Sequence, residues 1–242
     1  MTGSLWHLVA AAAVFVGTHL ALAAPGTRRA LVARLGEGPF IGLYSTVAAL
    51  ALLWLGLAYG DAPYWQLWPQ AAWMRLVPAV VMLVAAFFLV CGLTQHNPTA
   101  VNRGFDPTTR DPAPGVLKIT RHPVMWAIGL WALAHIVPNG DLAALILFGS
   151  LAFLALFGTT QIDAKRRDRD PEGFARFAEV TSNLPFAALL TGKTRQFWRT
   201  AYGKDPAKSL WREIGLARVA GALALYVAFI YLHPWIAGVP LR

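Results

Sequence analysis

The chain has 242 residues, of which 57% are hydrophobic and 14% are charged, whereas a soluble protein carries about 25% charged residues. A formal net charge of +9 would suggest a nucleic-acid partner in a soluble protein, but this apolar composition indicates a membrane protein with no nucleic-acid partner. The single cysteine, Cys91, excludes a disulfide framework and a metal site built from several thiolates.

Six hydrophobic runs approach the roughly 20 residues that a helix needs to cross a bilayer. In chain order they are Trp6–Ala24, Phe40–Tyr59, Leu76–Leu93, His122–Val137, Leu142–Thr159 and Ile214–Ile236. We interpret the first run as a retained span, because no basic residue precedes Arg28 and a signal peptide would begin with positive charge. The sequence therefore predicts an all-α fold, a polytopic membrane bundle of about six transmembrane helices.

The basic residues predict the orientation of this bundle. Nineteen of the 21 Lys and Arg residues lie in the connections after the first, third and fifth spans, taken as far as Arg218. Arg75 and Arg242 are the two exceptions. Because positively charged loops stay in the cytoplasm, we expect a multi-pass protein of the inner membrane with both termini in the periplasm.

The polar parts of the chain fit one membrane domain over residues 1–242. Its cytoplasmic loop, residues 160–213, contains a charge-rich stretch, Asp163–Val180, that we expect to form a solvated helix. Trp198 and Trp211 among basic residues then indicate an amphipathic segment in contact with anionic lipid headgroups. In the loop between spans two and three, an interfacial belt accounts for the aromatic residues Tyr64, Trp65, Trp68 and Trp73.

Histidines within the predicted spans are candidate functional residues, because ionisable side chains in hydrocarbon are costly. Three remain after those near the span ends are set aside: His19, His122 and His135. Neutral imidazole suits haem iron, for which two axial nitrogens suffice, whereas a zinc site needs more protein ligands. The alternative is that the histidines only form hydrogen bonds between helices, as in a non-catalytic membrane scaffold.

Three segments resemble the NnrU family. They are Gly115–His135 followed by Asn139-Gly140-Asp141, the segment Thr181–Leu189, and His19 with Leu22 and the basic residues beyond the first span. The resemblance implies a six-helix membrane protein linked to denitrification, nitric oxide or other redox metabolism. A relative of this family, 15-cis-zeta-carotene isomerase, is a membrane haem b protein, so the resemblance implies His19 and His135 as axial ligands and carotenoid cis-trans isomerisation as an alternative activity. Ala132 stands where that relative has a cysteine involved in redox-dependent ligation.

A second resemblance concerns the motif Arg121-His122-Pro123, which is similar to isoprenylcysteine carboxyl methyltransferases. In those enzymes this motif and a downstream glutamate hold S-adenosylmethionine, whereas the matching segment here, Ile162–Arg166, has no Glu-Glu pair. A methyltransferase that uses S-adenosylmethionine is therefore the alternative enzyme class. Arg121 and His122 at a helix N-terminus suit either that cofactor or a haem propionate.

The depth of the histidines leaves two ligand pairs open. A rise of 1.5 Å per residue puts His19 and His122 at about the same depth, whereas His19 and His135 differ by about 15 Å. Depth favours His122 as the partner of His19, and the resemblance favours His135. We predict His19 and His135 as the iron ligands, because the short turn at residues 138–140 can end the fourth span below the outer headgroups. Arg28, Arg121 and His122 are the predicted cofactor-binding residues, and the cofactor is haem b.

Overall fold

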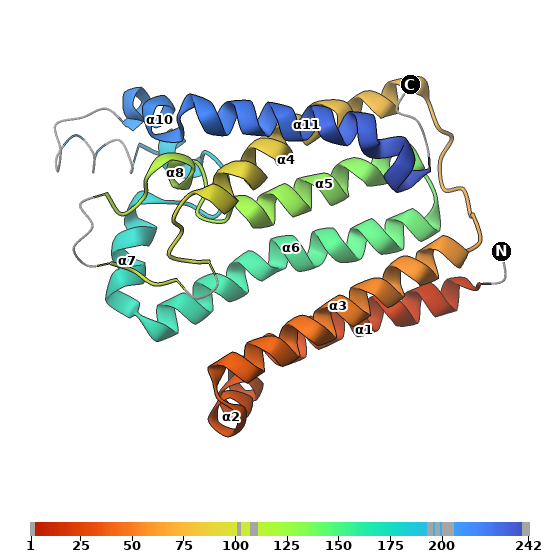
Figure 1. The fold of residues 1–242 in the computed structure, drawn as a ribbon, viewed down its shortest axis with the longest axis horizontal. Coiled ribbons are helices and arrows are strands. Elements are labelled where there is room, and N and C mark those ends of the chain that lie inside the picture. Colours follow the sequence, from red (N-terminus) through yellow and green to blue (C-terminus); the bar gives the residue numbers. More distant parts are fainter. Residues whose placement is uncertain are drawn as a thin grey trace. The chain divides into compact units, whose positions relative to one another are not determined.

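The computed structural model describes residues 3–100, 103–106, 111–192, 196, 199 and 206–238. Within these residues the chain forms helices and no strand, which confirms the predicted all-α fold class (Figure 1). The helices are α1 (Leu5–Ala23), α2 (Pro25–Leu35), α3 (Glu37–Asp61), η1 (Ala72–Arg75), α4 (Leu76–Thr94), η2 (Gly115–Lys118), α5 (Pro123–Asn139), α6 (Leu142–Arg169), α7 (Pro171–Val180), α8 (Ala187–Leu190), α10 (Pro206–Ile214) and α11 (Leu216–Ala237). Trp198 and Arg242, which the sequence analysis names, lie outside the described residues.

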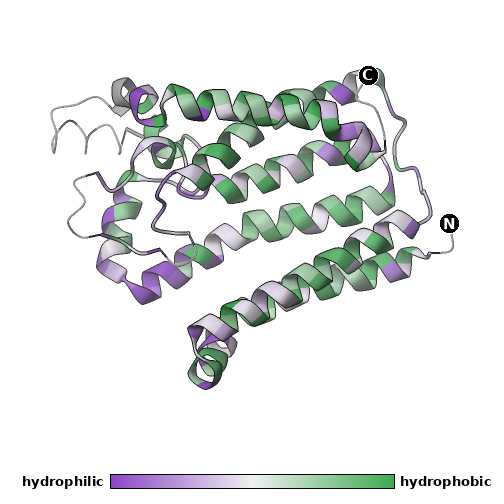
Figure 2. Cartoon of the chain, in the orientation of Figure 1, coloured by the Kyte–Doolittle hydropathy of each residue, from purple (hydrophilic) through white to green (hydrophobic). Residues whose placement is uncertain are grey.

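Among the described residues, five helices are long and apolar enough to cross a membrane: Leu5–Ala23, Glu37–Asp61, Ala72–Thr94, Leu142–Arg169 and Leu216–Ala237. They correspond, to within two residues at the ends that fall short, to five of the six predicted spans, and Figure 2 shows the apolar residues along them. The remaining predicted span forms α5, whose 17 residues rise about 26 Å, slightly less than the ~30 Å thickness of the hydrocarbon. The chain is a polytopic membrane protein.

The chain divides into two compact units. The first unit comprises Met1–Pro78 and Ala132–Leu154, and the second comprises Ala79–Trp131 and Ala155–Arg242. Helices α5 and α6 each contribute one part to either unit. The assignment of residues 1–242 to one domain stays a prediction.

In the first unit, α1 and α3 pack along each other (Figure 1). The Ser4 side chain caps α1 by accepting from the His7 amide at 3.1 Å, and α1 ends at Ala23, where Pro25 requires an extended residue before it. The face between the helices is buried and rich in small residues, which allows a close approach: Leu8, Ala11, Ala12 and Phe15 on α1, and Ala51, Leu55 and Ala58 on α3.

The connection after α3 is hydrogen-bonded to the turn between α5 and α6. The Trp68 indole donates to the Val137 carbonyl at 3.0 Å, and the Leu67 amide donates to the Gly140 carbonyl at 2.8 Å. Asp141 then caps α6 by accepting from the Ala144 amide at 2.9 Å. Trp68 therefore also fixes a turn, in addition to any role in an interfacial belt.

In the second unit, the segment just before α5 forms part of the core. Helix η2 is buried, with Val116 and Leu117 packed in a cluster that includes Phe88 and Phe177. The core thus joins η2 to α4 and α7, which fixes the segment that leads into Arg121 and α5.

The prediction of a solvated helix over Asp163–Val180 was wrong in two respects. Helix α6 continues through the charged residues to Arg169, and a separate helix, α7, begins at Pro171, where Asp170 accepts from the Gly173 amide at 2.8 Å. One face of this stretch is also buried, including Asp163, Arg166, Phe174 and Phe177. The buried charges are tolerated because each has polar partners within the protein.

Candidate functional site

His19 lies near the end of α1 with its imidazole held by the backbone. Its Nδ1 donates to the Phe15 carbonyl oxygen at 2.7 Å, because a carbonyl can only accept. The neutral ring therefore carries its lone pair on Nε2, which has no hydrogen-bond partner among the described residues. This is the arrangement usually found in metal-ligating histidines, in which the other ring nitrogen donates to a carbonyl or carboxylate.

Two aromatic rings surround His19. The Phe15 ring centroid lies 4.5 Å from that of the imidazole, and the Tyr44 centroid lies 5.7 Å away with its ring edge-on at 81°. Tyr44 in turn lies 6.4 Å from Phe40, one helical turn nearer the start of α3. An apolar, planar ligand would find aromatic neighbours here.

Arg28 stands at the end of this aromatic row. Its guanidinium lies 5.5 Å over the Phe40 ring and donates through Nη2 to Glu37 at 2.8 Å. An arginine has five N–H donors, so this single hydrogen bond leaves capacity for a second carboxylate. Contacts between neighbouring side chains thus lead from His19 through Tyr44 and Phe40 to Arg28.

His135 lies on the part of α5 that belongs to the first unit. Its ring centroid lies 5.3 Å from that of Phe148 on α6, at an interplanar angle of 31°. Tyr59 on α3 meets the same Phe148 ring edge-on, with centroids 6.4 Å apart. His19, Arg28 and His135 therefore all belong to the first unit.

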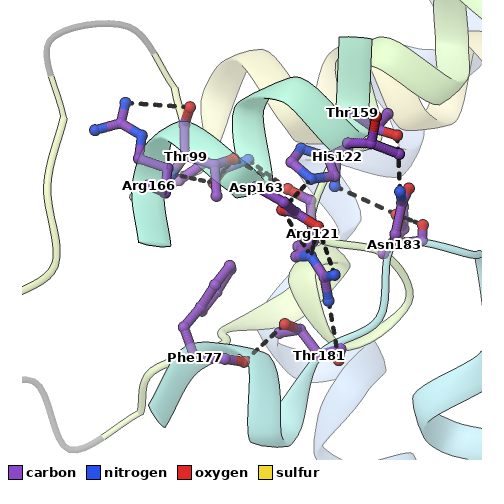
Figure 3. A network of polar contacts seen from close by, with 12 residues as sticks. Thr99, Arg121, His122, Thr159, Asp163, Arg166, Phe177, Thr181 and Asn183 are labelled. Carbon is purple, nitrogen blue, oxygen red and sulfur yellow. Dashed lines mark hydrogen bonds and ion pairs between the residues drawn. The ribbon is translucent and has the colours of Figure 1, made fainter. Parts of the chain in front are cut away.

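Arg121 and His122 belong to the second unit, where both bind Asp163 of α6 (Figure 3). His122 Nε2 lies 2.7 Å from Asp163 Oδ1. The Arg121 guanidinium donates two hydrogen bonds to Oδ2 of the same carboxylate, from Nε at 2.9 Å and from Nη2 at 2.6 Å. The His122 side chain is 1% exposed, so this is a buried cluster whose two opposite formal charges compensate each other.

A second set of hydrogen bonds fixes this cluster to the segment after α7. Arg121 Nη1 donates to the Thr181 carbonyl at 3.3 Å. The Asn183 carbonyl accepts from Thr120 Oγ1 at 2.6 Å and from the Trp126 indole at 2.8 Å. The Asn183 amide then donates to Thr159 Oγ1 at 2.7 Å, which returns the network to α6. The network thus joins the start of α5, α6 and the 181–183 segment.

Asp163 is the residue that the sequence interpretation missed. The sequence analysis placed Asp163 in a solvated helix, whereas Asp163 contacts His122 from 41 residues away. A signal was present, since Thr159, Asp163 and Arg166 repeat at the spacing of one helical face, and all three are buried. Arg166 donates to the Thr99 carbonyl at 3.2 Å, to the Arg103 carbonyl at 2.8 Å and also to that of Ala100.

Lys118 forms a second buried ionic cluster in the second unit. Its side chain is 0% exposed and forms ion pairs with Glu213 of α10 and with Asp111, the latter at 3.2 Å. Glu213 also accepts from the Gly115 amide at 2.7 Å. Burial raises the pKa of the Asp111 carboxyl above its ordinary value, and the adjacent Lys118 opposes that rise. Lys118, used above only as an indicator of topology, therefore ties the chain before α5 to α10.

Among the described residues, no three His, Cys, Asp or Glu side chains gather into a group that could hold a metal ion. A haem takes its equatorial nitrogens from the macrocycle and needs at most two axial ligands from the protein. The imidazoles of His19 and His135 have the donor chemistry of such axial ligands, and Arg28 is a cation for the carboxylates. Tyr44, beside His19, and Tyr59, which contacts Phe148 beside His135, lie about 22 Å apart along α3.

Comparisons with known proteins identify the family. The family model described as "NnrU protein" matches residues 7–241. The chain is similar to 15-cis-zeta-carotene isomerase of Zea mays, with 33% identity over 95 residues that cover 36% of this chain and 26% of the relative. It is also similar to the Arabidopsis thaliana protein of the same name, with 31% identity over 128 residues that cover 53% of this chain and 32% of the relative.

These matches therefore span about a third or less of the curated relatives. No solved structure gives a significant match. The family model, in contrast, covers nearly the whole sequence, in agreement with the predicted resemblance. The chain belongs to the NnrU family.

Proposed function

We propose that this chain is a b-type haem-binding protein of the inner membrane that acts in nitrogen-oxide or other redox metabolism. The observation that carries the proposal is the His19 imidazole, which is oriented by the Phe15 carbonyl at 2.7 Å with Nε2 left for a ligand. A bound haem b would supply an iron centre that exchanges one electron.

His135 is the proposed second ligand. It shares the first unit with His19 and lies against Phe148, whose ring gives the imidazole an apolar neighbour. His122 is less suitable, because its Nε2 is bonded to Asp163 at 2.7 Å and its side chain is enclosed by protein. The contact with Asp163 counts against His122, and we therefore propose the pair implied by the family resemblance.

Arg28 is the proposed partner of the haem propionates. Its guanidinium contacts the Phe40 ring, which is linked to His19 through Tyr44. Further N–H donors remain after its hydrogen bond to Glu37. Arg121 and His122, the other predicted cofactor-binding residues, are engaged by Asp163, which offsets the Arg121 charge. We therefore propose that these two residues position the start of α5, and through it the helix that carries His135.

A carotenoid cis-trans isomerase is the second candidate. It is favoured by the two similar proteins, both named 15-cis-zeta-carotene isomerase. Ala132, which is buried, stands three positions before His135 and has no thiol. The proposed isomerase therefore does not exchange an iron ligand for a thiol at that position.

The visible spectrum of the purified full-length chain tests the proposal. After expression with adequate haem supply, we expect a Soret band, a sharp α-band on reduction and about one haem per chain. A colourless protein that binds S-adenosylmethionine would contradict it and support a methyltransferase. A colourless protein that binds neither cofactor would support a non-catalytic scaffold. Conversion of a 15-cis-carotene by the haem-loaded protein would select the isomerase over other redox roles.

A further inference from the structure

The α1–α3 pair contains a second polar atom whose bonding is incomplete, besides His19 Nε2. Among the described residues, the Tyr44 hydroxyl has no hydrogen-bond partner, although the ring is half-buried and lies 5.7 Å from that of His19. Tyr44 lies about 10 Å along α3 from its first residue, within a helix that is apolar enough to cross a membrane. A hydroxyl without a hydrogen-bond partner costs free energy at such a site. We therefore expect Tyr44 Oη to bond a polar group from outside the described part of the protein.

The neighbours of Tyr44 indicate the chemistry of that missing group. On one side lies the His19 imidazole, and on the other lie Phe40 and then Arg28 over the Phe40 ring. The row therefore runs from an imidazole through aromatic rings to a cation. A molecule that matches it has a metal at one position, an apolar planar body and a carboxylate toward Arg28.

We propose, on the basis of the function proposed above, that Tyr44 Oη donates a hydrogen bond to a carboxylate of the haem held by His19. Arg28 binds the same edge of the cofactor through the guanidinium donors that Glu37 leaves unused. Tyr44 is thus a cofactor-positioning residue, which together with Arg28 would hold the carboxylates of a bound haem.

Replacement of Tyr44 by phenylalanine removes only the hydroxyl and keeps the ring against His19. The matched control is Tyr226→Phe, which removes a hydroxyl from the apolar helix α11 of the second unit, where Oη donates to the Ala79 carbonyl at 2.8 Å. Each full-length protein is loaded once with haem b and once with its dimethyl ester, in which the carboxylates are neutral. The rate of cofactor transfer to excess apomyoglobin is then measured.

With haem b we expect transfer from Tyr44→Phe to be about ten-fold faster than from the wild type, because a hydrogen bond to a charged group is lost. With the dimethyl ester the two proteins should release cofactor at similar rates, and Tyr226→Phe should match the wild type with both cofactors. Equal rates for Tyr44→Phe and wild type with haem b would overturn the inference. An equal acceleration with both cofactors would also overturn it, because the hydroxyl would then act on the protein structure. Failure of the wild type to take up any haem would instead overturn the proposed function.

Discussion

His122 and Asp163 meet through Nε2 and Oδ1 at 2.7 Å, although 41 residues separate them in the chain. Because Arg121 binds the same carboxylate, one side chain of α6 holds both residues that precede α5. The Arg-His-Pro motif, which resembles a cofactor-binding sequence, is therefore also an anchor for α5. This anchor fixes the start of the helix that carries His135.

Asp163→Asn should destabilise the protein substantially. The substitution leaves the Arg121 guanidinium, 13% exposed, without its negative partner, and breaking a buried ion pair costs about 3–5 kcal/mol. Thermal unfolding in detergent should show a markedly lower Tm than for the wild type. Asp168→Asn, an exposed change on the same helix, is the control and should leave the Tm nearly unchanged. Similar Tm values for the two variants would refute the proposed anchor.

Lys118→Met should also destabilise the protein, and the loss should depend on pH. Without the lysine, Asp111 and Glu213 lose the cation that they share. Burial already raises the pKa of Asp111, and removal of Lys118 raises it further. The folded state then binds protons more tightly than the unfolded state, so the stability of the variant rises as the pH falls.

The measurement is Tm against pH for wild type, Lys118→Met and the exposed control Lys165→Met. We expect the deficit of Lys118→Met relative to wild type to shrink between pH 7.5 and about pH 5, toward the pKa range of the carboxyls. A deficit that stays constant or grows as the pH falls would show that Lys118 acts through packing alone.

Gly115→Ala should cost about 1–3 kcal/mol. Gly115 has φ +52°, and a Cβ atom there would lie 2.7 Å from the Gln95 side-chain amide, which accepts from the Val116 amide at 3.2 Å. Gly17→Ala is the contrasting change, since nothing lies within 4 Å of its added Cβ and alanine favours a helix. Thermal unfolding should separate the two variants clearly, and a neutral Gly115→Ala would contradict the geometry of this turn.

The sequence was sufficient to predict the long apolar helices, because a long apolar run specifies a membrane helix locally. It also placed Arg28 close to His19, since Arg28 lies in α2, the short basic helix between α1 and α3. It was insufficient at Asp163, because charged residues after Thr159 suggest that a span has ended, whereas α6 continues to Arg169. Whether such a charge faces water or a buried arginine depends on tertiary contacts. The periodicity of the sequence shows only that these residues share one face of the helix.

The axial ligands are the central claim, and the visible spectra of three histidine variants test it most directly. His19→Ala, His135→Ala and His122→Ala are purified in the same detergent, and the haem content and reduced-minus-oxidised spectrum of each are compared with those of the wild type. We predict that His19→Ala and His135→Ala each lose the haem or its six-coordinate spectrum, because an axial position is left open. We predict that His122→Ala keeps a six-coordinate spectrum but is less stable and retains haem less well. An unchanged spectrum for His135→Ala together with loss of haem from His122→Ala would contradict the assignment and identify His122 as the partner of His19.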